Sequence, residues 1–561
     1  MASDSENIDP VPPLFLHSFK LLLFTTFAPM FRWLLLFCLF PAFYQAQYEA
    51  MAKNAFLNEH IQRNFEQWSI TQPSVKFHAA FRPYLSSSYV KASDSALPYQ
   101  AYSFRNFFLS RTYNERPEAR NWFNLQFHPL IETELGYDAL QRKVLPAAAG
   151  GMHLKLNIND DFTFAATMIA GNQVLPFFID TTVALSNVLP EFGQAYPTKT
   201  AAYNFFDYQG YLSYSPHNNK IFNFQLGRGK HFIGNGQRSV LLSDFAPAYP
   251  YFRINTNIWR LQYNVWYTLL NDVSQAAQMQ RRFRHKYATF HYLSWNVTKN
   301  FNIGLFENIV WRGTDTNQVR NFEVNYLNPL IFFRPVEYSV GSPDNSFIGL
   351  NLSGILFKTI RLYGQLGLDE FYLSEIRARR GWWANKQAWQ LGARYINAFR
   401  IKGLELVAEY NQVRPYTYTH GLPDQNYGHY AYPLAHPLGA NFRELLGSVS
   451  LRRDRWEIYL QTMLVKAGRD SLNRSSNVGS NIFLSYNTRH AEYGHYTGQG
   501  LSFTMLQAHL RFTYFVIPAM NLRLELGYIQ RSEQIPGIYT LQNPYLYIGL
   551  KSGIWNSYRN F

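Results

Sequence analysis

From residue 124 onward, short segments with alternating apolar and polar residues follow one another, separated by turn residues. In one of them Leu522, Leu524 and Leu526 alternate with Arg523 and Glu525. Successive side chains of a β-strand point to opposite faces, so each segment has an apolar face and a polar face that carries charge. This period of two predicts an all-β fold. Alternation by itself does not separate a soluble sandwich from a barrel that crosses a membrane.

The composition favours the membrane barrel. Aromatic residues make up 17% of the 561 residues and charged residues 16%, and the mean hydropathy is −0.25. That hydropathy is too polar for a bundle of transmembrane helices, each of which needs an apolar run of about 20 residues. A disordered chain would be poor in aromatic residues. A transmembrane β-barrel needs apolar residues at only every second strand position, with aromatic residues at both interfaces.

The lengths of the connections indicate the same fold. Short links, near residues 358–359, 399–400, 453–454 and 518–519, take turns with long links, at 312–346, 371–385, 412–442, 469–500 and 532–542. Outer-membrane barrels have short periplasmic turns and long extracellular loops. Counting strands with strict alternation, with 238–245 as one strand and 253–267 as another, predicts an antiparallel transmembrane β-barrel of about 18 strands, with 16 as the alternative.

Because the predicted number of strands is even, both ends of the mature chain are expected in the periplasm. The last strand is expected over residues 545–555, close to the terminal aromatic Phe561. A terminal aromatic residue of this kind is expected to be read by the machinery that inserts outer-membrane barrels.

The first 46 residues are predicted to form a leader that contains a secretory signal peptide. Met30 and Arg32 precede an apolar run over 33–43, and Tyr44, Gln45 and Ala46 follow, which is the pattern of a secretory signal peptide. We expect cleavage after Ala46, in preference to a signal anchor over 14–43 that charged residues and a proline would interrupt.

The rest of the chain divides into two parts. Residues 47–123 are expected to form a short periplasmic helical and irregular segment, with a helix over 47–70 because apolar residues recur there at helical spacing. Residues 124–561 form the predicted barrel. Cys38, the single cysteine, lies in the leader, so the mature chain is expected to have no disulfide.

Charged residues on the predicted strands are expected to face the barrel interior, because a Lys or Arg at the lipid midplane costs about 2–4 kcal/mol. Both signs of charge occur on these strands, which predicts a polar network inside the barrel. Its candidate members are Arg361, Asp369, Arg394, Glu405 and Glu409.

One long link combines arginines with tryptophans and is the candidate ligand-binding surface. It carries Arg377, Arg379, Arg380, Trp382 and Trp383. Arginine offers paired donors to carboxylates and phosphates, and tryptophan stacks on sugar rings. The same residues would also suit contact with lipopolysaccharide head groups or with the aromatic girdle. A second basic stretch, with Arg281, Arg282, Arg284 and Lys286, has the same two interpretations.

Several other motifs give little support for a phosphate-binding, metal or catalytic site. The glycine-rich residues 229–236 lack the Gly-Lys-Ser/Thr ending of a phosphate-binding loop. The histidines at 420, 429 and 436 match no standard metal-ligand spacing. Asp369 and Glu370 are adjacent on a predicted strand and point to opposite faces, so they do not converge as a pair of catalytic acids. We therefore expect no catalytic residues, no metal and no cofactor. Nucleic acid is not an expected partner, because the basic charge forms no recognised motif.

Six stretches are more specific than a generic barrel, at residues 229–239, 241–244, 368–371, 383–387, 409–418 and 433–442. Together they resemble the capsule-assembly (Wzi-like) outer-membrane β-barrel family, especially its RemB-like gliding motility branch in Bacteroidota. The resemblance covers roughly residues 123–442. It implies a monomeric barrel with a periplasmic helical plug, a role in holding or moving surface polysaccharide, and no catalytic residues. Residues 231–236 differ from the tryptophan-rich loop of the enterobacterial branch, so the resemblance does not indicate which glycan is bound.

The resulting expectation is an integral outer-membrane protein that is not an enzyme. It would engage acidic surface polysaccharide, in capsule or exopolysaccharide assembly or retention, or the gliding motility machinery. Its partners would be outer-membrane lipid and lipopolysaccharide, the polysaccharide, and motility or secretion proteins. A channel for small solutes or oligosaccharides is the alternative, and an outer-membrane hydrolase is the second alternative.

Overall fold

The computed structural model describes residues 54–85, 123–158, 161–216, 221–273, 284–313, 323–331, 344–470 and 477–561. The predicted leader, its cleavage after Ala46, and Arg281 and Arg282 of the second basic stretch lie outside these ranges. Of the predicted periplasmic segment, only residues 54–85 are described before the barrel begins at Phe123.

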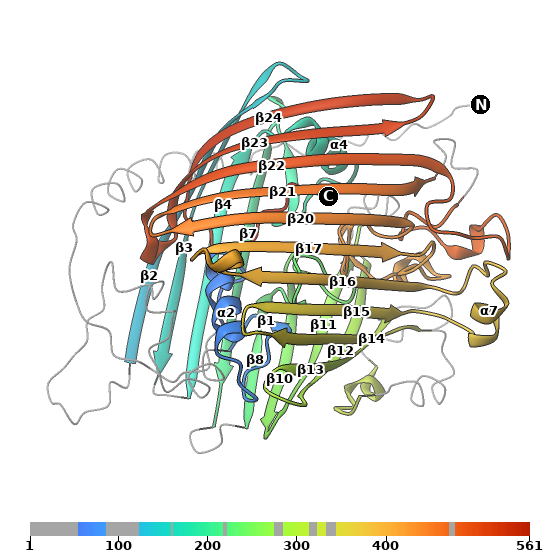
Figure 1. Ribbon diagram of the computed structural model, residues 1–561, viewed down its shortest axis with the longest axis horizontal. Coiled ribbons are helices and arrows are strands. Elements are labelled where there is room, and N and C mark those ends of the chain that lie inside the picture. Colours follow the sequence, from blue (N-terminus) through green and yellow to red (C-terminus); the bar gives the residue numbers. More distant parts are fainter. Residues whose placement is uncertain are drawn as a thin grey trace, which may run out of the picture. The chain divides into compact units, whose positions relative to one another are not determined.

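Within the described residues, eighteen antiparallel strands form a closed barrel (Figure 1). The ring closes where β24 pairs with β2, with Lys551 opposite Glu132. This confirms the predicted barrel and its strand number, and rules out sixteen. In order around the ring the strands are β2 (Phe123–Asp138), β3 (Lys143–Ile158), β4 (Phe162–Gln173), β7 (Tyr203–Tyr214), β8 (Phe222–Gly229), β10 (Tyr249–Ile258), β11 (Leu261–Asp272), β12 (Arg284–Asn296), β13 (Phe301–Arg312), β14 (Asn345–Leu356), β15 (Ile360–Leu368), β16 (Gln387–Ile396), β17 (Leu404–Val413), β20 (Phe442–Arg453), β21 (Trp456–Arg469), β22 (Leu501–Ile517), β23 (Leu522–Ile535) and β24 (Tyr539–Lys551).

Two errors in the predicted strands cancel in the count. Residues 253–267 are not one strand, because the chain turns at Trp259, whose φ is 56°, between β10 and β11. Residues 238–245 are not a strand of the wall. All eight of them are buried, whereas a wall strand would expose every second residue. They belong to a loop that runs inside the barrel.

The two faces of the wall have opposite chemistry. On β22, Leu506, Leu510 and Phe512 are exposed on the outer face, while Gln507 and Arg511 are buried on the inner face. In a soluble protein the apolar side chains lie inside. Here they lie outside and the polar ones inside, as a barrel in a lipid bilayer requires. None of the helices in the described ranges is long and apolar enough to cross a membrane.

The barrel has a short-turn end and a long-loop end. Tight turns join β10 to β11, β14 to β15, β16 to β17 and β20 to β21 at the short-turn end, where β2 also begins and β24 ends. In the described ranges, the connections at the long-loop end carry nine short elements. These are α4 (Phe177–Ser186), β5 (Val188–Leu189), β6 (Gly193–Pro197), η2 (Val324–Leu327), α7 (Leu373–Ala378), η4 (Pro423–Gln425), β18 (Gly428–His429), β19 (Tyr432–Pro433) and η5 (Tyr486–Thr488).

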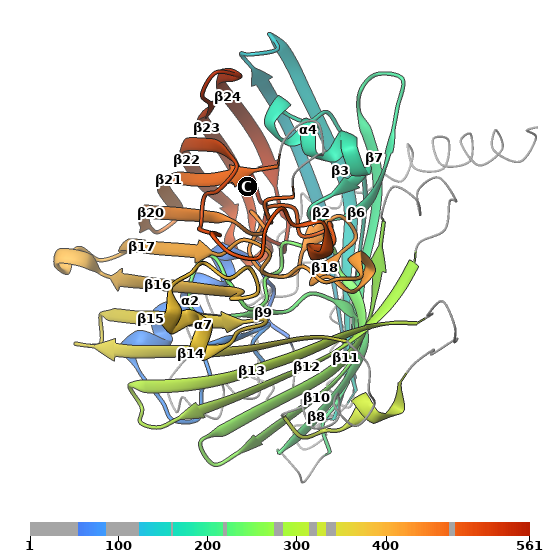
Figure 2. The same ribbon diagram turned by 90° about the vertical axis from the view of Figure 1, so that its right-hand side faces the viewer.

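Three segments lie inside the barrel (Figure 2). The first is α2 (Glu59–Thr71), shorter than the predicted helix, followed by β1 (Phe81–Arg82). The second, which we call the inner loop, is residues 230–248 between β8 and β10. Its strand β9 (Phe232–Ile233) pairs with β1. The third, the C-terminal segment, is residues 552–561.

The C-terminal segment differs from the prediction that the last strand reaches residue 555. β24 ends at Lys551, and the chain then turns inward. The ring of Phe561 packs against that of Phe245 of the inner loop, with centroids 5.0 Å apart, and Asn556 donates to Asp244 at 2.8 Å. The terminal aromatic residue is therefore a packing residue of the interior, and not the end of a wall strand.

Candidate functional site

Glu409 of β17 fixes the inner loop across the barrel. Its carboxylate accepts the backbone N–H of Gln237 at 2.9 Å and that of Arg238 at 3.1 Å, and the hydroxyl of Tyr363 at 2.9 Å. The amides of Gln390 and Asn411 also donate to it. With five donors around it, this carboxylate has the surroundings of a structural anchor.

Glycine is needed where the inner loop meets this carboxylate. A Cβ atom built on Gly236 would lie 2.4 Å from Glu409 Oε2, so a side chain there would displace the loop. The carbonyl of Gly236 accepts from the guanidinium of Arg82 at 3.0 Å, and that of Gly234 accepts at 3.2 Å. The segment that carries α2 and β1 therefore holds the inner loop from the other side.

Arg238 links the inner loop to the wall and to the C-terminal segment. Its guanidinium lies 3.3 Å from the carboxylate of Glu444 and donates to the backbone carbonyl and side chain of Asn560. Glu444 is also bonded to His436 at 2.8 Å. Burial lowers the pKa of His436, and the neighbouring Glu444 opposes that shift.

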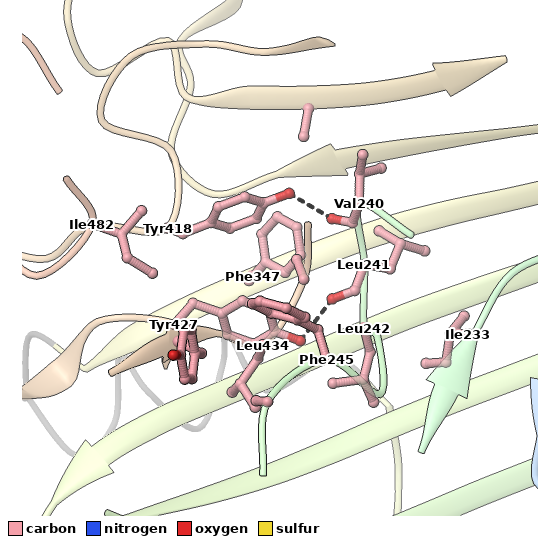
Figure 3. Packing of buried hydrophobic residues seen from close by; sticks show 14 of the residues in the cluster. Ile233, Val240, Leu241, Leu242, Phe245, Phe347, Tyr418, Tyr427, Leu434 and Ile482 are labelled. Atoms are coloured by element: carbon pink, nitrogen blue, oxygen red, sulfur yellow. Dashed lines mark hydrogen bonds between the residues drawn. The ribbon is translucent and has the colours of Figure 1, made fainter. Parts of the chain in front are cut away.

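Toward the long-loop end, aromatic and aliphatic side chains pack on the inner loop (Figure 3). The hydroxyl of Tyr418 donates to the carbonyl of Val240 at 2.7 Å, and that of Tyr427 donates to the carbonyl of Leu241 at 2.8 Å. All four residues are buried. The long loops are thereby joined to the inner loop, on which they pack closely.

Toward the short-turn end, α2 is held by ion pairs with the wall. Arg394 bridges Glu66 of α2, at 2.9 Å, and Glu405 of β17, at 2.8 Å. Arg63 of α2 lies 3.0 Å from Glu457 of β21. A cavity of about 280 Å³ remains between α2, the wall and the C-terminal segment. Eight carboxylates and eight Arg or Lys side chains line it, so it has no excess of either charge.

The predicted interior residues divide into two groups. Arg361, Arg394, Glu405 and Glu409 all lie on β15–β17 and are buried inside, where Arg361 donates to Ser69 of α2 at 2.9 Å. Asp369 lies beyond the end of β15, among the long loops. It accepts the backbone N–H of Tyr418 at 2.8 Å and lies 3.8 Å from Lys386. Burial raises the pKa of Asp369 to about 7, although Lys386 acts in the opposite direction.

The three arginines of the candidate binding surface are exposed on and beside α7, at the long-loop end. Arg377 is in the last turn of α7, Arg379 follows it, and Arg380 pairs with Glu375 at 2.7 Å. The guanidinium of Arg380 also lies over the ring of Tyr493, 4.5 Å from its centroid.

The two tryptophans differ from each other. Trp382 is half-buried, and its ring stacks on that of Tyr372 with centroids 5.1 Å apart. Trp383 is only 9% exposed. Its indole N–H donates to Glu492 at 2.9 Å, and Arg489 lies over its ring at 4.3 Å. Trp383 therefore joins two long loops, and Trp382 is the tryptophan that reaches the surface.

Sequence reasoning missed the tyrosines that lie beside these arginines. The backbone of Arg380 accepts from Gly494, and that of Gly381 accepts from His495, which brings Tyr493 and Tyr496 next to α7. Their partner loop is more than a hundred residues away in the sequence, so no local pattern connected them. We call the resulting set the basic-aromatic surface. It consists of the exposed or half-buried residues Tyr372, Arg377, Arg379, Arg380, Trp382, Tyr493 and Tyr496.

The second basic stretch gives no comparable surface in its described part. Lys286 is buried on β12, and its ammonium donates to the backbone carbonyl and side chain of Asn426 at 2.7 and 2.8 Å. It holds the long loop between β17 and β20 in place.

The three loop histidines do not come together. His420 accepts from the backbone of Leu422 and His429 from that of Asn271, while His436 pairs with Glu444. In the described ranges, no three His, Cys, Asp or Glu side chains are grouped as metal ligands would be.

Comparison with known proteins identifies the fold. No family model matches the chain, and no curated protein matches its sequence. Among solved structures, Wzi of Escherichia coli, an outer membrane protein involved in group 1 capsule assembly and a carbohydrate-binding β-barrel, is similar with a TM-score of 0.55 and 13% identity, over 89% of this chain and 99% of Wzi. OprD of Pseudomonas aeruginosa (TM-score 0.41, 10% identity, 76% and 94% covered) and OccAB4 of Acinetobacter baumannii (0.41, 9%, 76% and 97%) are also similar. At such identities the likeness to Wzi shows the architecture, a closed barrel of eighteen strands.

Proposed function

We propose that the protein is an integral outer-membrane barrel, not an enzyme, that engages acidic surface polysaccharide through its long-loop end. The observation that carries the proposal is the combination of an interior that the inner loop crosses with the basic-aromatic surface at the long-loop end. Arginine pairs with carboxylates, and tyrosine and tryptophan stack on sugar rings, so this surface offers both kinds of contact that an acidic polysaccharide needs. The likeness to Wzi, which binds carbohydrate, supports it.

Placement in the outer membrane is supported by the exposed apolar outer face of the wall. Leu226, Leu391 and Leu506 are among the outward residues that water would leave unfavourably exposed. Both ends of the described barrel segment lie at the short-turn end. If short turns are periplasmic, as in known outer-membrane barrels, both ends of the barrel wall are periplasmic, the C-terminal segment turns from there into the barrel, and the basic-aromatic surface faces the cell exterior.

The two alternatives are less well supported. A channel needs a continuous aqueous path, whereas the inner loop crosses the barrel and is bonded to Tyr418, Tyr427 and Glu409. A hydrolase needs a carboxylate free to meet its substrate, whereas Glu409 is surrounded by donors. The role in capsule or exopolysaccharide assembly or retention, and the link to gliding motility or secretion proteins, stay predictions from the family resemblance.

Topology is tested by cysteine labelling in a Cys38→Ser background. Arg377→Cys, on α7, should react with a membrane-impermeant maleimide on intact cells, because the long-loop end faces out. Asp454→Cys, in the exposed turn between β20 and β21, should react only after the outer membrane is permeabilised. Labelling of Asp454→Cys on intact cells would contradict the orientation.

Ligand binding is tested by its dependence on salt. The triple variant Arg377→Ala/Arg379→Ala/Arg380→Ala should weaken binding of an acidic polysaccharide by roughly tenfold at low ionic strength, since three exposed charge contacts at about 0.5 kcal/mol each are lost. The deficit should shrink in high salt, which screens such contacts. The variant Tyr372→Ala/Trp382→Ala/Tyr493→Ala should lose affinity about equally at both salt concentrations, because stacking is not screened.

The matched control changes three exposed charges at the opposite end of the barrel, as Lys358→Ala/Arg400→Ala/Lys402→Ala. It removes the same net charge and should bind like the wild type. Equal losses in the two charge variants would mean that binding follows net charge and not this surface.

A further inference from the structure

The outer wall of β11–β13 departs from the chemistry of the rest of the outer face. Tyr267 pairs with Phe252, which is exposed on the outer face, so Tyr267 also faces outward. Strand pairing places Thr289 opposite Tyr267, and Glu307 opposite His291 on the next strand. Thr289 and His291 are 0% exposed. Polar side chains thus face outward here and are nevertheless buried.

Residues 323–331, which include η2, lie against Tyr267 and Thr289 from outside the barrel, and we call them the flap. The hydroxyl of Thr289 donates to the carbonyl of Tyr326 at 3.0 Å, and that of Tyr267 donates to the carbonyl of Leu327 at 2.8 Å. Figure 2 shows the yellow-green turn of η2 outside the wall, beside β10 and β11.

The flap extends far down the wall. It is connected to the long-loop end, yet Ile331 lies with its backbone beside the hydroxyl of Tyr263, the third residue of β11 counted from the short-turn end. Tyr326 lies beside Thr289, which is nearer the long-loop end of β12. The flap therefore lies at the height of the membrane-facing wall and not above it.

Backbone groups at this depth need partners, because hydrocarbon offers none. The outward hydroxyls of Tyr267 and Thr289 supply them to two flap carbonyls. Within the flap, the N–H of Tyr326 donates to the carbonyl of Glu323, and that of Leu330 donates to the side chain of Asn328. Polar residues on the outer wall would be costly against bare lipid. Here they are explained by the hydrogen bonds that they donate to the flap.

The exposed side chains of the flap are mostly apolar, although Asn325 is exposed as well and donates to Glu323 at 2.7 Å. Val324 and Leu330 are 69% and 68% exposed, and Leu327 is also exposed. These side chains continue the exposed apolar belt formed by Phe252 and Trp295 on the neighbouring wall.

We propose that the flap lies in the bilayer, where lipid acyl chains contact Val324, Leu327 and Leu330 and the flap separates Thr289 and the hydroxyl of Tyr267 from lipid. The occupant of this surface is the hydrocarbon of the membrane itself. The proposal rests on the proposed outer-membrane placement and goes beyond it, because it puts a connection that is not a strand at the depth of the lipid.

The test uses single cysteines in a Cys38→Ser background, labelled with a bimane fluorophore and reconstituted in phospholipid vesicles that contain nitroxide-labelled acyl chains. Leu330→Cys should be quenched by the lipid nitroxide to within about a factor of two of Leu391→Cys, an exposed outer-wall position on β16. Arg377→Cys, at the long-loop end, should be quenched mainly by a water-soluble reagent.

The outcomes separate the two proposals. Aqueous quenching of Leu330→Cys, with lipid quenching of Leu391→Cys, would overturn the flap and leave the membrane placement intact. Aqueous quenching of Leu391→Cys would overturn the membrane placement itself. Adding Tyr267→Phe and Thr289→Val to Leu330→Cys should shift its quenching toward the aqueous reagent, because two carbonyls lose their donors. Unchanged quenching would mean that these hydroxyls do not hold the flap.

Discussion

Replacing Glu409 with leucine is expected to release the inner loop and to raise the ion conductance of the barrel in planar bilayers several-fold over a low wild-type value. The change removes the acceptor of five donors, two of which are backbone N–H groups of the inner loop. Buried donors left without a partner cost about 1–3 kcal/mol each, so the free energy of unfolding should fall by at least about 3 kcal/mol.

Glu409→Gln is the matched control for this prediction. Glutamine has nearly the same shape and keeps one acceptor oxygen, so it should retain part of the loop contacts and give intermediate conductance. Urea unfolding in detergent micelles measures the change in stability independently of conductance. A leucine variant that conducts and unfolds like the wild type would show that the inner loop is held by its other contacts.

The wall of the barrel could be predicted because its physics is local. Each strand meets lipid on one face and the interior on the other, so a period of two appears in the sequence, as at Leu522–Leu526. The alternation of short and long connections then indicated the topology, although the predicted long link over 532–542 is a tight turn between Ile535 and Tyr539. The predicted number of strands was right although β10 and β11 were merged, since a strand was also assigned to residues 238–245.

Two of the interior segments, residues 238–245 and the C-terminal segment, could not be predicted in the same way, because neither forms a strand with one face toward lipid. Residues 238–245 and the C-terminal segment carry no face that alternates with solvent or lipid. Their places depend on partners distant in sequence, such as Glu409 for Arg238 and Phe245 for Phe561. The flap could not be predicted because Thr289, His291 and Glu307 interrupt the apolar outer face, and the sequence pattern does not show that a distant loop packs on Thr289.

The exposure of the candidate binding residues was predicted only in part. Residue types indicated the arginines of α7, and these are exposed. Type alone could not show that Trp383 is packed between two loops while Trp382 is at the surface, nor that Tyr493 lies beneath Arg380. These distinctions arise from the contact between the α7 loop and the loop before β22, which only the three-dimensional arrangement brings together.

Replacing Arg394 with leucine is expected to destabilise the protein by about 3–5 kcal/mol, the usual loss when one member of a buried ion pair is removed. Arg394 lies between two buried carboxylates, of Glu66 at 2.9 Å and Glu405 at 2.8 Å. Arg82 and Arg63 remain near them, at 3.4 and 3.5 Å, and should limit the loss. Because Glu66 belongs to α2, the helix should also become more accessible to protease added to the reconstituted protein.

A double-mutant cycle separates loss of the pair from loss of packing. Arg394→Leu/Glu405→Leu removes both charges on the wall, and it should be more stable than Arg394→Leu alone, since a buried carboxylate left with only the more distant Arg63, at 3.5 Å, is removed as well. Arg394→Lys keeps the charge but not the forked geometry that reaches two carboxylates, so its stability should fall between those of the wild type and the leucine variant. If the double variant is less stable than Arg394→Leu by the full cost of Glu405→Leu, the two side chains act independently, and α2 is held by Arg63 and Glu457 instead.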